Sequence, residues 1–270
     1  WALYDTVEQL GYRPVLLHKP AALWEPRYNA PDSVAGKFIH AHCRTAESVS
    51  NDDEWRQLAA GFPTVLVGSD ALWRYEVCGR QTGLLYLLDF LPDDAKRLAY
   101  GVTMGKALGC PAEQLSAWSR ALHRFDAISV KELAEALVLA NNFDLPAELV
   151  LDPILLPEKS RYLALAEQAV APKDDPEPRF VFSYIEGIDD RKRRMAVRAG
   201  EVHHASLRCH VNLDRFPEAK AELGLPVAYH IMTEDWLYYM SHAEFIVTDS
   251  YHGMCMALLL EKPFVVLAHE

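Results

Sequence analysis

Residues 245–267 read FIVTDSYHGMCMALLLEKPFVVL, and this stretch decides the fold class. Phe245–Thr248 has the length and apolar composition of a buried strand, Tyr251–Leu260 has the length of a helix, and Phe264–Leu267 is a second strand-like run. A strand, a helix and a strand in this order predict a right-handed crossover between parallel neighbours. Because both strands are apolar throughout, we expect the sheet to be covered on both faces.

The same alternation continues towards the N-terminus and predicts an α/β protein. The expected strands are residues 13–18, 64–67, 98–102, 126–130, 149–151, 180–184 and 206–211, and the expected helices are 3–10, 113–124, 131–141, 189–200 and 234–241. A proline-rich acidic stretch at 171–178 is expected to be a loop or interdomain linker. We therefore predict two Rossmann-like parallel-sheet lobes, an N-terminal α/β lobe of residues 1–156 and a C-terminal α/β lobe of residues 157–270.

The composition narrows the class of protein. The chain has 270 residues, half of them hydrophobic, with 27 Lys plus Arg against 38 Asp plus Glu and a formal net charge of −11. This composition is typical of a folded globular protein, and the acidic excess argues against a broad nucleic-acid-binding surface. Arg191–Arg194 is a local basic run, interpreted as a solvated helix face. The longest apolar run, Met254–Leu260, is far shorter than the roughly 18–20 residues of a membrane span.

The five cysteines predict neither a disulfide framework nor a zinc site. They are scattered and odd in number, and no C-x-x-C occurs, so we expect reduced thiols in a cytoplasmic protein. His40 and His42 have metal-ligating side chains, but on a strand their spacing of two would place them on one face without evident further ligands, and no metal site is predicted. The chain begins at Trp1 and ends just after a strand-like run, so we expect a fragment truncated at both ends.

The main candidate site lies where the strand ending at Thr248 meets the next helix. Ser250 is placed to be the N-cap, with its hydroxyl accepting a hydrogen bond from an amide of the first turn. The amides and dipole of a helix N-terminus favour an anion such as phosphate. His252, in the first turn, is able to bind phosphate when charged or to donate a proton as a general acid. The alternative is a capping histidine in a buried turn.

Two further strand ends carry candidate residues. After the strand at 64–67, Asp70 is able to orient a hydroxyl and Trp73 to stack on a sugar face, although spacing alone favours a turn with an Asp cap and a core Trp. After the strand at 126–130, Lys131 would project where an anion could bind, or would be ordinary surface. The dinucleotide, P-loop and nucleophile-elbow motifs are all absent from the sequence, which lowers the odds of a dehydrogenase, a P-loop NTPase or a hydrolase.

Taken in order, several segments resemble the polysaccharide pyruvyl transferase family. They are GSDALW at 68–73, similar to the family's G-S-D-Q-x-W, YLLDF at 86–90, FDAISVKE at 125–132, VLDPILL at 150–156, DWL at 235–237, AEFIVTDSYHG at 243–253 and KPF at 262–264. The resemblance covers nearly the whole chain. Its most specific piece is the D-S-x-H-G segment that is followed by a helix and K-P-F.

The resemblance implies a two-lobed fold similar to GT-B glycosyltransferases and transfer of the enolpyruvyl unit of phosphoenolpyruvate to sugar hydroxyls as a cyclic ketal, with release of phosphate. The acceptor would be a saccharide or lipid-linked oligosaccharide. The enzyme would need no metal or other cofactor, and we expect it in the cytoplasm or peripheral to the inner membrane face.

The expected site residues follow from the resemblance together with the positions above. His252 would be catalytic or a phosphate ligand, and the C-terminal lobe would be the donor side. The expected donor-binding residues are Lys131, Asp249, Ser250 and Gly253, and the expected acceptor-binding residues, on the N-terminal lobe, are Asp70 and Trp73.

Departures from the family pattern keep two alternatives open. Lys131 stands where the family often has Arg and keeps the charge without the bidentate fork, Ala71 replaces the usual Gln, and the family's opening strand and first loop precede residue 1. The alternatives are a GT-B-like glycosyltransferase that uses a nucleotide sugar and a non-catalytic carbohydrate-binding relative. Ligand preference discriminates among the three.

Overall fold

The structure, a computed structural model, divides into two compact units. It describes residues 1–17, 33–47, 49, 51–75, 84–104, 110–170, 179–187, 189–211, 227–228 and 231–268. The first unit comprises Trp1–Pro26 and Cys43–Leu156, and the second comprises Arg27–His42 and Pro157–Glu270. The division after Leu156 coincides with the expected lobe boundary, but Arg27–His42, expected in the first lobe, belongs to the second unit.

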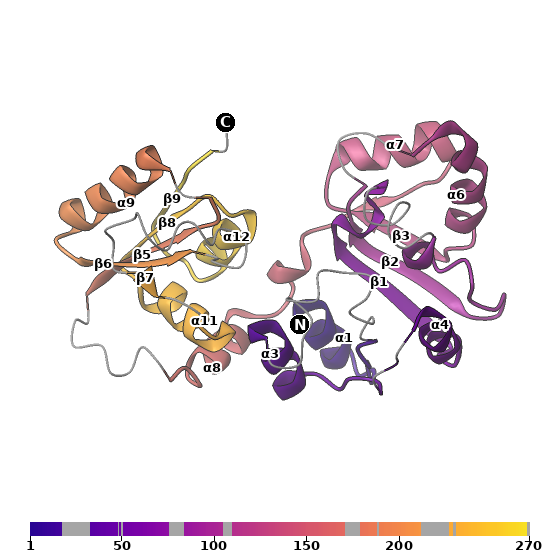
Figure 1. The fold of residues 1–270 in the computed structure, drawn as a ribbon, viewed down its shortest axis with the longest axis horizontal. Helices are drawn as coiled ribbons and strands as arrows, with labels where there is room; N and C mark the ends of the chain where they lie inside the picture. The colour runs from indigo at the N-terminus through magenta and orange to yellow at the C-terminus, as the bar shows by residue number, and fades with distance from the viewer. Residues whose placement is uncertain are drawn as a thin grey trace. The chain divides into compact units, whose positions relative to one another are not determined.

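The first unit is built on a four-stranded parallel sheet in the order β1-β2-β3-β4. The strands are β1 Thr64–Asp70, β2 Lys96–Val102, β3 Ala127–Val130 and β4 Glu148–Leu149. The helices are α1 Ala2–Gln9, α4 Asp52–Ala60, α6 Leu115–Leu122 and α7 Leu133–Phe143, with short 3₁₀ turns η2 Ala71–Trp73, η3 Leu85–Leu87, η4 Ala112–Gln114 and η5 Pro153–Leu155. Figure 1 shows α6 and α7 on one side of this sheet and α4 on the other, as continuous apolar strands require.

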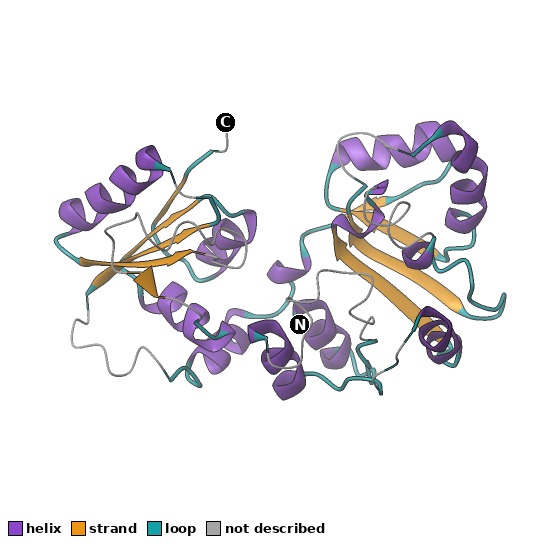
Figure 2. Cartoon of the chain, in the orientation of Figure 1, coloured by secondary structure: helices purple, strands orange, loops and turns teal. Residues whose placement is uncertain are grey.

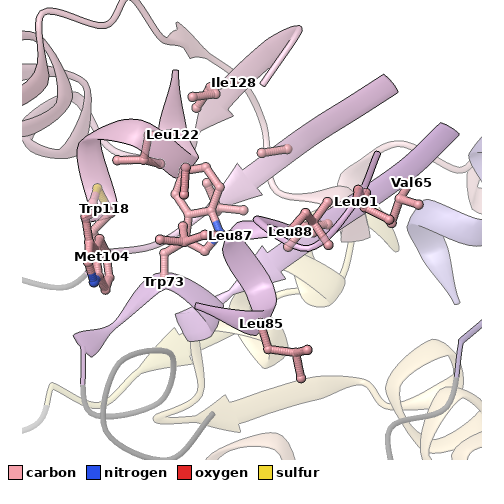
Figure 3. Packing of buried hydrophobic residues seen from close by; sticks show 14 of the residues in the cluster. Val65, Trp73, Leu85, Leu87, Leu88, Leu91, Met104, Trp118, Leu122 and Ile128 are labelled. Carbon is pink, nitrogen blue, oxygen red and sulfur yellow. The ribbon is translucent and has the colours of Figure 1, made fainter. Parts of the chain in front are cut away.

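The core of the first unit consists of large side chains from the sheet and its covering turns. Figure 3 shows Trp73, Trp118 and Met104 packed with leucines that include Leu87 and Leu122. The helix ends follow local rules: the Asn51 side chain accepts from the amide of Glu54 at 2.9 Å and so caps α4.

The second unit is built on a five-stranded parallel sheet in the order β7-β6-β5-β8-β9. The strands are β5 Phe180–Ile185, β6 Ser206–Val211, β7 Val227–Ala228, β8 Phe245–Thr248 and β9 Phe264–Val266, and the helices are α3 Val34–His42, α8 Lys159–Ala166, α9 Asp190–His203, α11 Thr233–His242 and α12 Tyr251–Leu259. Figure 1 shows α9 on one side of this sheet and α11 on the other, and Figure 2 shows the same alternation of helices and strands.

Most of the expected elements are confirmed within a few residues of each end, and some are not. The strand expected at 13–18 is wrong over its described residues 13–17, where Leu16 forms an isolated bridge to Thr45 and no strand is found; His18 lies outside the described residues. His40 and His42 lie in α3, not on a strand. The expected linker at 171–178 lies outside the described residues. No helix in the described part of the chain is long and apolar enough to cross a membrane.

Candidate functional site

The strand order of the second sheet marks one position as a binding site. From β5 the chain runs outward through β6 and β7, and then returns to the other side of β5 to form β8 and β9. The direction of winding therefore reverses between β5 and β8. Ligands of open α/β sheets bind outside the carboxyl ends of the strands at such a switch point. The residues that follow β5 and β8 are Glu186 and Asp249, and both have polar contacts across this point.

Ser250 occupies the N-cap position of α12, as expected, but its hydroxyl does not bond to an amide of the helix. It donates to the Glu186 Oε1 carboxylate oxygen at 2.8 Å, because a charged acceptor makes the stronger hydrogen bond. The Ser250 amide donates to Thr248 Oγ1 at 3.1 Å, and the helical ladder begins with the Met254 amide donating to the Ser250 carbonyl at 3.0 Å. The expected capping bond is thus wrong, although the position is right.

Asp249 organises the switch point from a buried position. Its carboxylate accepts from the amides of Glu186 at 2.6 Å and Gly187 at 3.3 Å, and from Lys192 Nζ at 2.7 Å. The Lys192 ammonium also donates to the Gly187 carbonyl at 2.7 Å. These partners are groups of the protein itself, so the expectation that Asp249 touches a donor stays a prediction. Lys192 is buried, which corrects the interpretation of the whole basic run as solvated helix face.

Gly253 and His252 complete the first turn of α12. A Cβ atom on Gly253 would lie 2.5 Å from Thr248 Oγ1 and 3.0 Å from Tyr184 Cδ1, so only glycine lets the helix start this close to the ends of β8 and β5. His252 is partly buried, and its ring meets that of the half-exposed Tyr251 edge-on, at 5.4 Å between centroids. His252 therefore stands at the helix N-terminus, where phosphate binding and proton donation are both chemically available.

Aromatic rings flank this point on the β6 side. The Tyr184 ring stacks on His210 of β6 at 5.7 Å and meets Trp236 of α11 edge-on at 5.3 Å. Sequence analysis missed Tyr184, Glu186 and Lys192. The first two stand at or just after the carboxyl end of β5, so the rule that had selected Asp249 and His252 after β8 would have found them.

The expected site residues of the first unit have different surroundings. Lys131 follows β3 as expected, and its Nζ donates to Asp152 Oδ2 at 2.8 Å in a nearly buried ion pair. The other Asp152 oxygen accepts from the Ile154 amide at 3.0 Å. Asp70 is the last residue of β1. The structure brings Asp249, Ser250, His252 and Gly253 together in the second unit, whereas Lys131, Asp70 and Trp73 belong to the first.

Trp73 is a core residue, and its expected stacking on a sugar is wrong. Its side chain is fully buried, its Nε1 donates to the Tyr86 carbonyl at 3.0 Å, and its ring meets Phe125 edge-on at 5.2 Å. Both polar and apolar surfaces of the indole are therefore used inside the fold. Among the described residues, no three His, Cys, Asp or Glu side chains are grouped as metal ligands would be.

The comparison with protein families matches one family over residues 1–270, the whole chain. The chain belongs to the polysaccharide pyruvyl transferase family. This is a transferase family. No curated protein matches the chain by sequence.

Solved structures similar to this polysaccharide pyruvyl transferase family member are GT-B-fold proteins. The UDP-GlcNAc 2-epimerase of Methanocaldococcus jannaschii, in complex with UDP-GlcNAc and UDP, is 12% identical with a TM-score of 0.53, covering 98% of this chain and 79% of that one. The wall teichoic acid polymerase TagF is 10% identical with a TM-score of 0.55, covering 98% of this chain and 65% of that one. At such identities the likeness shows the fold alone, two parallel-sheet α/β lobes.

The segments that carry the resemblance to the polysaccharide pyruvyl transferases have two kinds of role. In residues 68–73, Gly68 and Trp73 have structural roles: a Cβ on Gly68 would lie 2.6 Å from the Tyr100 carbonyl oxygen, and Trp73 fills the core. Residues 245–253 form β8, the switch-point turn and the start of α12. This second segment combines a polar cluster with a helix N-terminus.

Proposed function

We propose that this protein transfers pyruvate from phosphoenolpyruvate to a sugar of a cell-surface polysaccharide as a ketal and releases phosphate. The observation that carries the proposal is the position of residues 249–253, the most specific segment of the family resemblance, at the switch point of the second sheet. Family membership over the whole chain supports the same reaction class.

In this proposal the start of α12 binds the donor phosphate. The first amides of an α-helix precede its hydrogen-bond ladder and point along the axis, and the helix dipole adds positive potential there. The Ser250 hydroxyl at the same end binds the phosphate by turning its proton from Glu186 to the donor, and Gly253 keeps the turn close to the sheet. His252 binds the phosphate or protonates the methylene carbon of the donor, a contribution of about 10²–10⁴ in rate for a positioned acid.

Other parts of the proposal concern partners and location. The acceptor is a saccharide or a lipid-linked oligosaccharide, in exopolysaccharide or cell-envelope synthesis, and the reaction uses no metal or other cofactor. The protein works in the cytoplasm, where it would meet a lipid-linked acceptor at the inner membrane face. Lys131 remains a proposed anion-binding residue, which requires its ion pair with Asp152 to open. Asp70 contacts the acceptor.

A thermal-shift titration tests the donor without knowledge of the acceptor. The native protein and the His252→Ala variant are heated with phosphoenolpyruvate and, separately, with UDP-sugars. Ligand at about 100 times Kd adds roughly 2.7 kcal/mol of stability. A shift with phosphoenolpyruvate alone that is lost in the variant supports the proposal. A shift only with a UDP-sugar indicates a glycosyltransferase, and no shift with either rejects phosphoenolpyruvate as a donor for the protein on its own.

A further inference from the structure

The Glu186 carboxylate is a feature of the switch point that no proposed role has yet used. It follows β5, the central strand of its sheet, and lies across the switch point from α12. Its side chain is partly exposed, and its Oε1 accepts a hydrogen bond from the Ser250 hydroxyl at 2.8 Å. A carboxylate that already accepts from an aliphatic hydroxyl beside the donor-binding helix has the geometry needed to accept from a sugar hydroxyl.

The main chain around Glu186 is fixed from two directions. Asp249 accepts from the Glu186 amide at 2.6 Å and from the next amide, that of Gly187, at 3.3 Å. Lys192 donates to the Gly187 carbonyl and to Asp249, both at 2.7 Å. The charge of Lys192 is thus directed to Asp249 and the loop backbone. Positioned groups of this kind catalyse proton transfer efficiently because little reorganisation is needed at the moment of reaction.

From this arrangement we infer that Glu186 is the base that takes the proton from the attacking sugar hydroxyl. The inference rests on the proposed function and names a catalytic residue for it. Lys192 and Asp249 act as positioning residues, because their hydrogen bonds hold the loop that carries Glu186.

The proton balance requires one base and one acid. In the addition step the sugar oxygen forms a bond to C2 of phosphoenolpyruvate, Glu186 takes the hydroxyl proton, and protonated His252 delivers a proton to C3, which becomes a methyl group. In the second step a neighbouring hydroxyl oxygen forms its bond to C2 as the C2–O bond to phosphate breaks, and phosphate leaves with the bonding electrons. The second hydroxyl proton returns His252 to its charged form, and the proton on Glu186 passes to the departing phosphate.

The first experiment measures donor binding to the full chain by calorimetry at low salt. Glu186→Gln removes a negative charge beside an anionic donor, so it should tighten phosphoenolpyruvate binding by about three- to tenfold. Glu201→Gln is the matched control, because it removes the same charge from the exposed last turn of α9 and should leave binding unchanged. The placement of Glu186 beside the donor is overturned if Glu186→Gln has the same unfolding temperature as the native protein but binds phosphoenolpyruvate equally or more weakly.

The second experiment measures phosphate release with methyl glycosides of galactose, glucose and mannose as acceptor probes. Glu186→Gln should lower kcat by at least about 100-fold, and formate should partly restore turnover to Glu186→Ala. Ser250→Ala should raise the KM for phosphoenolpyruvate and leave kcat unchanged. If Glu186 only oriented the Ser250 hydroxyl, Glu186→Gln would have the same effect as Ser250→Ala, so a loss of kcat in Glu186→Gln alone identifies Glu186 as the base. Turnover by Glu186→Gln within tenfold of native overturns the role. If no glycoside is turned over, the binding result alone decides.

A failure of the proposed function is recognisable separately. If the native protein does not bind phosphoenolpyruvate, the donor assignment fails and the role of Glu186 fails with it. If the native protein binds and turns over the donor while Glu186→Gln does the same, only the inference about Glu186 fails.

Discussion

Lys192 Nζ lies 2.7 Å from Asp249 Oδ2, so α9 is joined to the end of β8 by an ion pair whose side chains are 10% and 0% exposed. The same two side chains bind the loop that follows β5. The loop after β5 and the start of α9, which are close in sequence, are therefore fixed to the end of β8, and Lys192 and Asp249 are 57 residues apart. The positions of Glu186 and of the start of α12 both depend on this ion pair.

Breaking this pair should destabilise the protein strongly. Either Lys192→Met or Asp249→Asn leaves a buried charge without its partner, which costs about 3–5 kcal/mol. The double variant should lose less than the sum of the two, because no charge remains unpaired. The measurement is the free energy of unfolding in urea for the four proteins of the cycle. Additive losses would contradict a direct interaction.

An exposed ion pair in the same unit provides the comparison. Arg198 NH1 lies 2.9 Å from Glu201 Oε2 on α9, with side chains that are mostly exposed. Solvent screening makes such a pair worth less than about 1 kcal/mol. Arg198→Ala should therefore change the free energy of unfolding far less than Lys192→Met.

Gly253→Ala should separate α12 from the sheet and weaken anion binding. The added Cβ would lie 2.5 Å from Thr248 Oγ1, closer than Cβ atoms in proteins approach a non-bonded atom, so the first turn has to shift. We expect at least a tenfold loss of phosphoenolpyruvate affinity in calorimetry, which is about 1.4 kcal/mol of binding free energy. The free energy of unfolding should fall by less than this. Gly61→Ala is the control, since its Cβ would meet only the Leu58 carbonyl, at 3.3 Å. Native affinity in Gly253→Ala would exclude a role for the start of α12 in binding.

The fold was largely predictable because most of its strands are apolar runs. Phe245–Thr248 forms a strand with the expected bounds, since a buried parallel strand needs apolar residues on both faces. Ser206–Val211 also has the expected bounds, although Ser206, Arg208 and His210 alternate with its apolar residues. The run at 13–18 was equally apolar at its centre, but a strand also needs neighbours, and sequence pattern does not show which neighbours exist.

The site was only half predictable. The place of a residue within a strand or helix depends on the local sequence, whereas its hydrogen-bond partners depend on the tertiary fold. The N-cap position of Ser250 follows from the strand and helix around it, but the acceptor of its hydroxyl is Glu186, 64 residues earlier. Lys192 looked like part of a solvated basic run, and only the packing of α9 on the sheet turns its ammonium inward to Asp249. The direction of the Trp73 ring was likewise decided by packing.

Trp73 should matter for stability and not for sugar binding. Trp73→Ala empties a fully buried site and should cost about 3–5 kcal/mol in the free energy of unfolding. Trp73→Phe loses the hydrogen bond to the Tyr86 carbonyl and should cost less. Tyr12→Ala, at a 68% exposed aromatic of the same unit, should change stability by under about 0.5 kcal/mol. Native stability in Trp73→Ala would contradict the buried position.

Cys209 should make the protein less stable at alkaline pH. Burial raises the pKa of its thiol to about 12, against a weaker opposite effect of the Ser183 hydrogen bond, while the unfolded thiol titrates near 9.0. Above pH 9 the unfolded state loses a proton that the folded state keeps, so the free energy of unfolding falls by about 1.4 kcal/mol per pH unit up to about 12 and is unaffected below 9.

The measurement for Cys209 compares urea unfolding of the native protein and Cys209→Ala from pH 8 to pH 11. The two stabilities should run parallel below pH 9, and the native protein should lose stability faster above it. Thiol labelling at pH 8 gives an independent check: Cys209 is 1% exposed and should react far more slowly than the partly exposed Cys110, whose pKa burial also raises. Equal labelling rates at the two cysteines would show that the Cys209 thiol is open to solvent.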